Sequence, residues 1–244
     1  MIVLGGVVAA LLAGFTKGTI GFGFPTIGTP VLALFVDVKI AVAVLVPPNI
    51  VLDGLQARRG GAGFAAAFRR LLPLLLFGAV GIVLGTRLLV VLPPRVVGGL
   101  LGAFLVVFVA LNVTGLRLHV RPERERWMSP VVGLLAGIVG GITNVPGTPL
   151  VMYFYTLALP KTEFVRWVAI SFVAYKVVQL VALVWYGAFT LAMVPATAGV
   201  TAVSLGSFLV GQMIQDRLEQ KAFNRVVLIF LAVLGLALIA RAAS

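Results

Sequence analysis

The sequence predicts an all-α integral membrane protein built from two four-segment repeats. Of its 244 residues, 61% are apolar and 11% are charged, and the mean hydropathy is +1.16. Soluble domains carry about 45–50% apolar and about 25% charged residues, and a chain of this size cannot hide so much apolar surface from water. The apolar runs lack the alternation of a β-barrel, and helices satisfy their own backbone in lipid. A water-soluble domain is therefore excluded.

A spanning helix needs about 20 apolar residues, so the length leaves room for roughly eight hydrophobic segments. The expected segments are, in order, Ile2–Val36, Ile40–Leu55, Leu71–Leu92, Val96–Leu116, Ser129–Leu159, Phe164–Tyr186, Leu191–Ile214 and Phe223–Ile239. No basic region precedes the first segment, as a cleaved signal peptide would require, so we expect the amino terminus to stay. The hydrophilic stretch Arg117–Trp127 contains the sole histidine, His119, and indicates a linker. We expect repeats at 1–116 and 129–244, joined by a cytoplasmic linker at 117–128.

The first and fifth segments are longer than one crossing needs, and both are interrupted. The interruptions lie within Gly14–Pro30 and Gly140–Pro149, where glycine and proline at high density end helices. We expect neither half of either segment to be long enough to cross. Paired interruptions at matching positions of two repeats are the best sequence pointer to a transporter's binding site.

Shared motifs support the duplication. The matching pairs, first half against second, are Leu12-Ala13-Gly14 with Leu135-Ala136-Gly137, Gly28-Thr29-Pro30 with Gly147-Thr148-Pro149, Leu72-Pro73 with Val194-Pro195, and Leu84-Gly85-Thr86 with Leu205-Gly206-Ser207. Their order is the same in both halves, which favours a four-segment duplication.

The positive charges predict the topology. The cations expected in the cytoplasm are Arg58, Arg59, Arg69, Arg70, Arg117, Arg121, Arg124, Arg126, Lys161, Arg166, Arg217, Lys221 and Arg225, whereas Lys39, Arg87, Arg95 and Arg241 depart from the pattern. All the cations of the first group face the cytoplasm if the fifth segment enters and returns on the cytoplasmic side. By symmetry the first segment re-enters from outside, which gives six crossings and two halves of opposite orientation. Most of the +12 net charge is then a topology signal beside anionic lipid, and nucleic acid is not an expected partner.

Two glycine-rich motifs resemble the TauE/SafE sulfite exporter family, together with the Leu-Gly pairs of the third and seventh segments. The motifs are GFTKGTIGFGFPTIGTPVLAL at 14–34 and GLLAGIVGGITNVPGTPLVMYF at 133–154. The resemblance spans nearly the whole chain. It implies about eight hydrophobic segments in two repeats, and transport of sulfite, sulfoacetate or a related organosulfur anion.

A small oxyanion needs backbone N–H groups at helix ends, hydroxyls, amides and a cation, and both interruptions supply them. The candidates are Thr16, Lys17, Gly18, Thr19, Gly21, Gly23, Thr26 and Thr29 in the first, and Thr143, Asn144, Gly147 and Thr148 in the second. Thr29-Pro30 and Thr148-Pro149 are each suited to beginning a helix. The alternative is that the glycines and threonines only permit close helix packing.

Polar residues also occur on the second and sixth segments. Asn49, Asp53 and Gln56 share one helical face, and Ser171, Tyr175, Lys176 and Gln179 lie on the sixth segment. Ionisable groups within a membrane are usually functional: Asp53 could carry a coupling proton, and Lys176 could attract the anion. The alternative for both is that they snorkel to the interface, which is also the expected role of Arg87.

Together these features favour a secondary transporter that works by alternating access and is driven by an anion or proton gradient. The sequence has no GxxxxGK[ST] nucleotide loop and no cysteine, and no cofactor, metal or enzymatic activity is expected. Three alternatives stay open: a passive anion channel, an intramembrane enzyme using Ser171 and Lys176, and a structural partner without transport. The expected partners are the small anion and the bilayer of a prokaryotic cytoplasmic membrane, and a homo-oligomer is left open.

Overall fold

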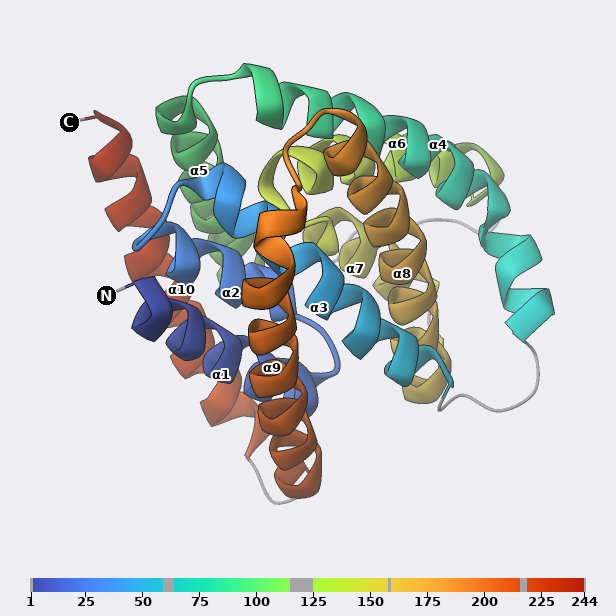
Figure 1. The fold of residues 1–244 in the computed structure, drawn as a ribbon. Helices are drawn as coiled ribbons and strands as arrows, with labels where there is room; N and C mark the ends of the chain where they lie inside the picture. The colour runs from blue at the N-terminus through green and yellow to red at the C-terminus, as the bar shows by residue number, and fades with distance from the viewer. Residues whose placement is uncertain (1, 59–63, 115–124, 158, 216–218, 244) are drawn as a thin grey trace.

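The chain is an integral membrane protein made of helices (Figure 1). The computed structural model describes residues 2–58, 64–114, 125–157, 159–215 and 219–243, which contain no strand. The helices are α1 (Ile2–Ile20), α2 (Phe24–Ala33), α3 (Val38–Arg58), α4 (Phe64–Val91), α5 (Pro94–Thr114), α6 (Glu125–Thr143), α7 (Gly147–Thr156), α8 (Lys161–Trp185), the 3₁₀ turn η2 (Leu191–Met193), α9 (Val194–Ile214) and α10 (Gln220–Ala243). In these ranges, seven helical stretches are long and apolar enough to cross a membrane.

The first predicted segment folds as two helices, α1 and α2, that separate at Gly21–Gly23. Gly21 has φ +92° and Gly23 has φ +99°, a left-handed conformation that glycine adopts without strain. Near the start of α1, Gly5 lies against Phe35, which follows α2, and further along α1 Ala13 lies against Gly28 of α2. Residue numbers therefore run in opposite directions along α1 and α2, and the chain turns back on itself at the first break.

The expectation that neither half of this segment could cross is wrong for α1. This helix has 19 residues and is long and apolar enough to span, whereas α2 has only 10. The difference arises because Gly14 and Gly18 do not end the helix. They lie inside α1, where their bare backbones allow close contact with Ser204 and Phe208 of α9.

The expected start of α2 at Thr29-Pro30 is also wrong. The helix begins at Phe24, with Pro25 in its first turn and Pro30 in its interior. Pro25 fits the first turn because no helical hydrogen bond is required of its nitrogen there. The second break matches its expectation more closely, since α7 begins at Gly147, one residue before Thr148.

Contacts between the two halves are cross-paired. Along α4 and α6, Gly133 lies against Leu74 and Gly141 lies against Ile82, so the two helices run parallel. α1 packs along α9, again in parallel, because Gly14 lies near Ser204 and Gly18 near Phe208. α5 packs on α10, and α3 lies between α9 and α8 (Figure 1). The first helix of each half therefore packs along the fourth helix of the other half.

A glycine-to-alanine pair tests this close packing. A Cβ at Gly137 would collide with the backbone of α4 at Gly78 and Gly81, whereas a Cβ at Gly206 of α9 would meet no atom within 4 Å. Overpacking costs typically about 1–3 kcal/mol, while alanine gains up to about 1 kcal/mol of helix propensity over glycine. We expect Gly137→Ala to lower the midpoint of thermal unfolding in detergent and Gly206→Ala to leave it unchanged or raise it. Equal midpoints for the two variants would contradict this packing.

Candidate functional site

A buried ion pair joins α1 to α3 close to the first break. The Nζ atom of Lys17 donates to Oδ1 of Asp53, and both side chains are 0% exposed. Lys17 Nζ also lies 6.0 Å from the ring centroid of Phe172 on α8, within range of a cation–π attraction. Lys17 is therefore the counter-ion of a carboxylate. Because Asp53 is fully enclosed, the snorkelling alternative does not apply to it.

The second lysine of the site, Lys176, lies on α8 at the second break. Its Nζ donates to the backbone oxygen of Asn144 at 2.9 Å, to Oδ1 of Asn144, and to Oε1 of Gln179 at 2.7 Å. These acceptors are neutral. Gln179 in turn donates through Nε2 to the backbone oxygens of Gly140 and Gly141, at 3.2 and 3.3 Å. Gln179 thus bonds two carbonyl groups in the last turn of α6, of which that of Gly140 also accepts from the N–H of Asn144, and Lys176 bonds the carbonyl group of Asn144 just beyond the helix. Lys176 is also 0% exposed, so it does not snorkel.

Asn144 connects the two breaks. It has φ +68°, a left-handed conformation that asparagine tolerates better than most residues. Its Nδ2 donates to Oγ1 of Thr29 on α2 at 2.9 Å, while its two oxygens accept from Lys176. One residue therefore holds the second break against α2 and receives the ammonium group of α8.

Several buried polar atoms on α3 and α8 have no hydrogen-bond partner among the described residues. They are both amide atoms of Asn49, Oδ2 of Asp53, Oε1 of Gln56 and Oγ of Ser171. Asn49, Asp53 and Ser171 are fully buried. Buried polar groups in native proteins nearly always have a partner. Asn49 and Asp53 are one turn apart on α3 and therefore point to the same side. These atoms indicate a place where water or a polar ligand binds. We call Lys17, Asn49, Asp53, Asn144, Lys176 and Gln179 the polar centre.

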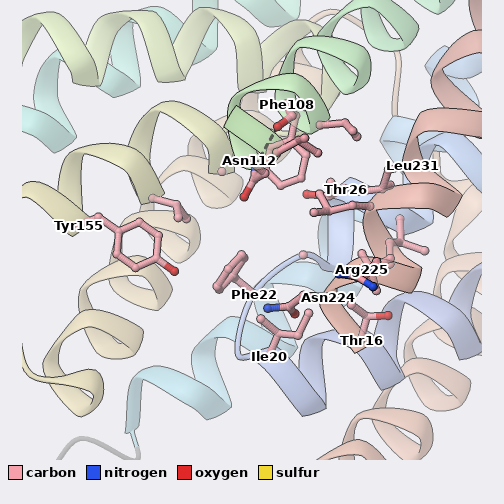
Figure 2. Close-up of a pocket in the computed structure, with 18 of the residues that line it drawn as sticks. Thr16, Ile20, Phe22, Thr26, Phe108, Asn112, Tyr155, Asn224, Arg225 and Leu231 are labelled. Carbon is pink, nitrogen blue, oxygen red and sulfur yellow. Dashed lines mark hydrogen bonds between the residues drawn. The ribbon is translucent and has the colours of Figure 1, made fainter. Parts of the chain in front are cut away.

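A cavity of about 1000 Å³ reaches both breaks (Figure 2). Thr16, Gly23 and Thr26 line it at the first break, and Gly147 lines it at the second. Most of the wall is apolar and comes from α5, α7, α8 and α10, and its remaining polar side chains are Asn112, Tyr155, Asn224 and Arg225. Tyr155, Asn224 and Arg225 are exposed, so the cavity reaches the surface of the protein at these residues.

Phe172 borders this cavity and also lies beside Lys17. Its side chain lines the cavity yet is only 1% exposed, and its ring faces Lys17. It lies next to Gly147, where an added Cβ would be 3.4 Å from the ring. The sequence motifs do not single out Phe172. Its position one helical turn before Lys176, on the same face of α8, is the signal that could have identified it.

The structure brings together many of the predicted residues. Lys17 and Asp53 meet across α1 and α3, and Thr29, Asn144, Lys176 and Gln179 form one hydrogen-bonded chain. Thr16, Gly23, Thr26 and Gly147 line the cavity instead.

Other predicted residues stabilise the protein locally. The hydroxyl of Thr19 donates to the backbone oxygen of Thr16 at 3.0 Å, and that of Thr143 donates to Val139 at 2.7 Å. Gly18 packs on Phe208. Tyr175 donates to the backbone oxygen of Leu74 at 3.0 Å, which fixes α8 against α4.

The other four residues singled out in the sequence are Gly21, Arg87, Thr148 and His119. Gly21 shapes the first break through its positive φ. Arg87 is exposed, which fits an interfacial role. The side chain of Thr148 and the whole of His119 lie outside the described residues.

Comparison with known proteins gives one match. A family model described as "Sulfite exporter TauE/SafE" matches residues 6–238. Searches of curated proteins and of solved structures find no significant match. The matched range includes both breaks, α3 and α8, so every residue of the polar centre lies within it.

Proposed function

Because the chain belongs to the TauE/SafE sulfite exporter family, we propose that it is a secondary transporter that exports a small sulfur oxyanion across a prokaryotic cytoplasmic membrane. Sulfite, sulfoacetate and related organosulfur anions are the candidate substrates. The observation that carries the proposal is Lys176, a fully buried cation whose hydrogen-bond acceptors in the described residues are all neutral. Burying a charge without a counter-ion is costly, and a bound anion would remove that cost.

The cross-paired contacts support two repeats of opposite orientation. If α1–α5 correspond to α6–α10, the parallel pair α1 and α9 is the counterpart of the parallel pair α6 and α4. α3 packs on its own counterpart α8, and α5 packs on its own counterpart α10. A two-fold axis that relates inverted repeats produces such crossed pairs of helices between the two halves. Transporters built from inverted repeats bind their substrate where the repeats meet. We propose that α1–α2 and α6–α7 are re-entrant hairpins entering from opposite sides.

The cavity supports an alternating-access mechanism. It reaches the surface at Arg225, near the start of α10, an end that the positive-inside rule places on the cytoplasmic side. We therefore propose that this conformation is open to the cytoplasm and admits the anion as far as Phe172. The described lining of this cavity contains none of the six residues of the polar centre, which favours a transporter over an open channel.

Replacing Phe172 with alanine should weaken this barrier. We expect uncoupled efflux of the anion to rise by about tenfold, which corresponds to about 1.4 kcal/mol off a barrier. The measurement is efflux from vesicles with no anion on the other side. Phe77→Ala, which removes a ring that is 48% exposed on α4, is the matched control. An unchanged efflux rate in Phe172→Ala would show that this ring is not the barrier.

Transport by the purified protein in lipid vesicles tests the proposed function. We expect saturable uptake of labelled sulfite that is accelerated by unlabelled sulfite on the opposite side. Flux that never saturates and shows no counterflow would instead indicate a passive channel. Absence of uptake for sulfite, sulfoacetate and simple sulfonates would contradict the proposed substrate class.

A further inference from the structure

We infer that the polar centre selects an anion of single negative charge, and that Asp53 sets this limit. The inference rests on the proposed function and makes its substrate class more specific. It favours the singly charged hydrogensulfite ion over doubly charged anions such as sulfate or sulfoacetate. Asp53 acts here through its charge and does not need to touch the anion.

In the described residues, four charged side chains are buried: Lys17, Asp53, Arg166 and Lys176. Arg166 lies ten residues before Lys176 on α8, about 15 Å away along the helix axis. The polar centre itself therefore contains two ammonium groups and one carboxylate. Asp53 bonds directly to Lys17, whose Nζ lies 6.0 Å from the ring of Phe172, one helical turn before Lys176 on the helix that packs along α3. With all three groups ionised, the net charge of the empty centre is +1.

The side chains of Lys17, Asp53 and Lys176 are all 0% exposed, so water screens their charges poorly. One negative charge brings the centre to neutrality. A second negative charge would have no counter-ion and would lie in a region that also contains the carboxylate of Asp53. A low-dielectric environment strengthens both the attraction of the first charge and the repulsion of the second.

The unpartnered polar atoms on α3 also favour a singly charged anion. Asn49 offers an unpartnered donor, Nδ2, and unpartnered acceptors are present at Asn49 Oδ1, Asp53 Oδ2 and Gln56 Oε1. A fully ionised oxyanion can only accept hydrogen bonds, and it would leave these acceptors without partners. A singly charged acid anion such as hydrogensulfite carries both acceptor oxygens and one acidic hydrogen. It therefore fits the mixed set of groups, as well as the charge.

Two anions of similar shape and fixed charge test the inference. Methanesulfonate carries one negative charge at neutral pH, and sulfate carries two. We expect the parent protein to bind methanesulfonate more tightly, measured by titration calorimetry in detergent. Asp53→Asn raises the net charge of the centre to +2, so the ratio of the two dissociation constants should shift toward sulfate by about tenfold or more. Lys17→Gln lowers the charge to zero and should abolish methanesulfonate binding.

The double variant Lys17→Gln/Asp53→Asn restores a net charge of +1 and should return the ratio to that of the parent. It also gives an answer if Asp53→Asn alone does not fold. Arg87→Gln, which removes an exposed cation on α4, is the control for general electrostatic effects and should leave the ratio unchanged. An unshifted ratio in Asp53→Asn, or a shifted ratio in the double variant, would overturn the inference while leaving anion transport intact. Failure of the parent to bind either anion would refute the proposed function, and this inference with it.

Discussion

Replacing Lys176 with methionine should reduce anion transport by about 100-fold or more, which corresponds to roughly 2.7 kcal/mol at about 1.4 kcal/mol per factor of ten. Methionine is of similar length but carries no charge. The polar centre would therefore lose Lys176, the cation that has no direct ion pair with a carboxylate. The remaining pair, Lys17 and Asp53, is neutral overall and offers an anion no net attraction. The measurement is the initial rate of sulfite uptake into vesicles, together with anion-dependent thermal stabilisation of the purified protein.

This variant needs a folding control, because it leaves the oxygens of Asn144 and Gln179 without their donor. A buried unsatisfied group costs about 1–3 kcal/mol, although the variant also avoids burying a charge. A folded Lys176→Met protein that has lost transport supports a role in binding. Arg87→Met is the matched control, since it removes an exposed cation by the same substitution. Transport at the parental rate in Lys176→Met would contradict the proposed binding site.

Replacing Asp53 with leucine should lower the free energy of unfolding by about 3–5 kcal/mol. The substitution leaves the ammonium group of Lys17 fully buried without its carboxylate. Removing one partner of a buried pair costs far more than replacing both partners with apolar residues. The double variant Lys17→Met/Asp53→Leu should therefore recover most or all of the lost stability. Denaturant unfolding in detergent measures both variants.

The comparison of single and double variants separates charge from packing. Should Asp53→Leu prove as stable as the parent, the ion pair would contribute nothing to the fold. Should the double variant be no more stable than the single one, the loss would come from the shape of the leucine side chain. The two variants should also differ in anion transport. The double variant keeps Lys176 and a net charge of +1 in the polar centre, whereas Asp53→Leu alone raises that charge to +2.

The sequence could predict the helical membrane fold and the place of both breaks, because these depend on local properties. Apolar runs of spanning length specify the helices, and the dense glycine and proline around Gly21 and Pro146 specify where helices end. The expectation failed where glycine has two roles. Gly14 and Gly18 look like helix-ending residues in the sequence, but the backbone of α9 packs against them and keeps them helical.

The contacts of the polar centre could not be predicted, because they join residues far apart in the chain. Lys17 and Asp53 are 36 positions apart, and Asn144 and Thr29 are 115 positions apart. Composition identifies two intramembrane lysines and one acid, but only the tertiary structure determines that Asp53 bonds to Lys17 and leaves Lys176 with neutral acceptors. Phe172, the proposed barrier, was missed for a similar reason, since a phenylalanine on an apolar helix carries no local signal of function.

The most direct test of the central claim is the position of a bound anion. Selenite resembles sulfite, and its selenium can be located by anomalous diffraction from crystals of the protein soaked in the anion. We expect an anomalous peak in the polar centre within hydrogen-bond distance of Lys176 Nζ, and we expect it to be absent in Lys176→Met. A peak found only at Arg225 at the mouth of the cavity, or a central peak that persists in Lys176→Met, would contradict the account.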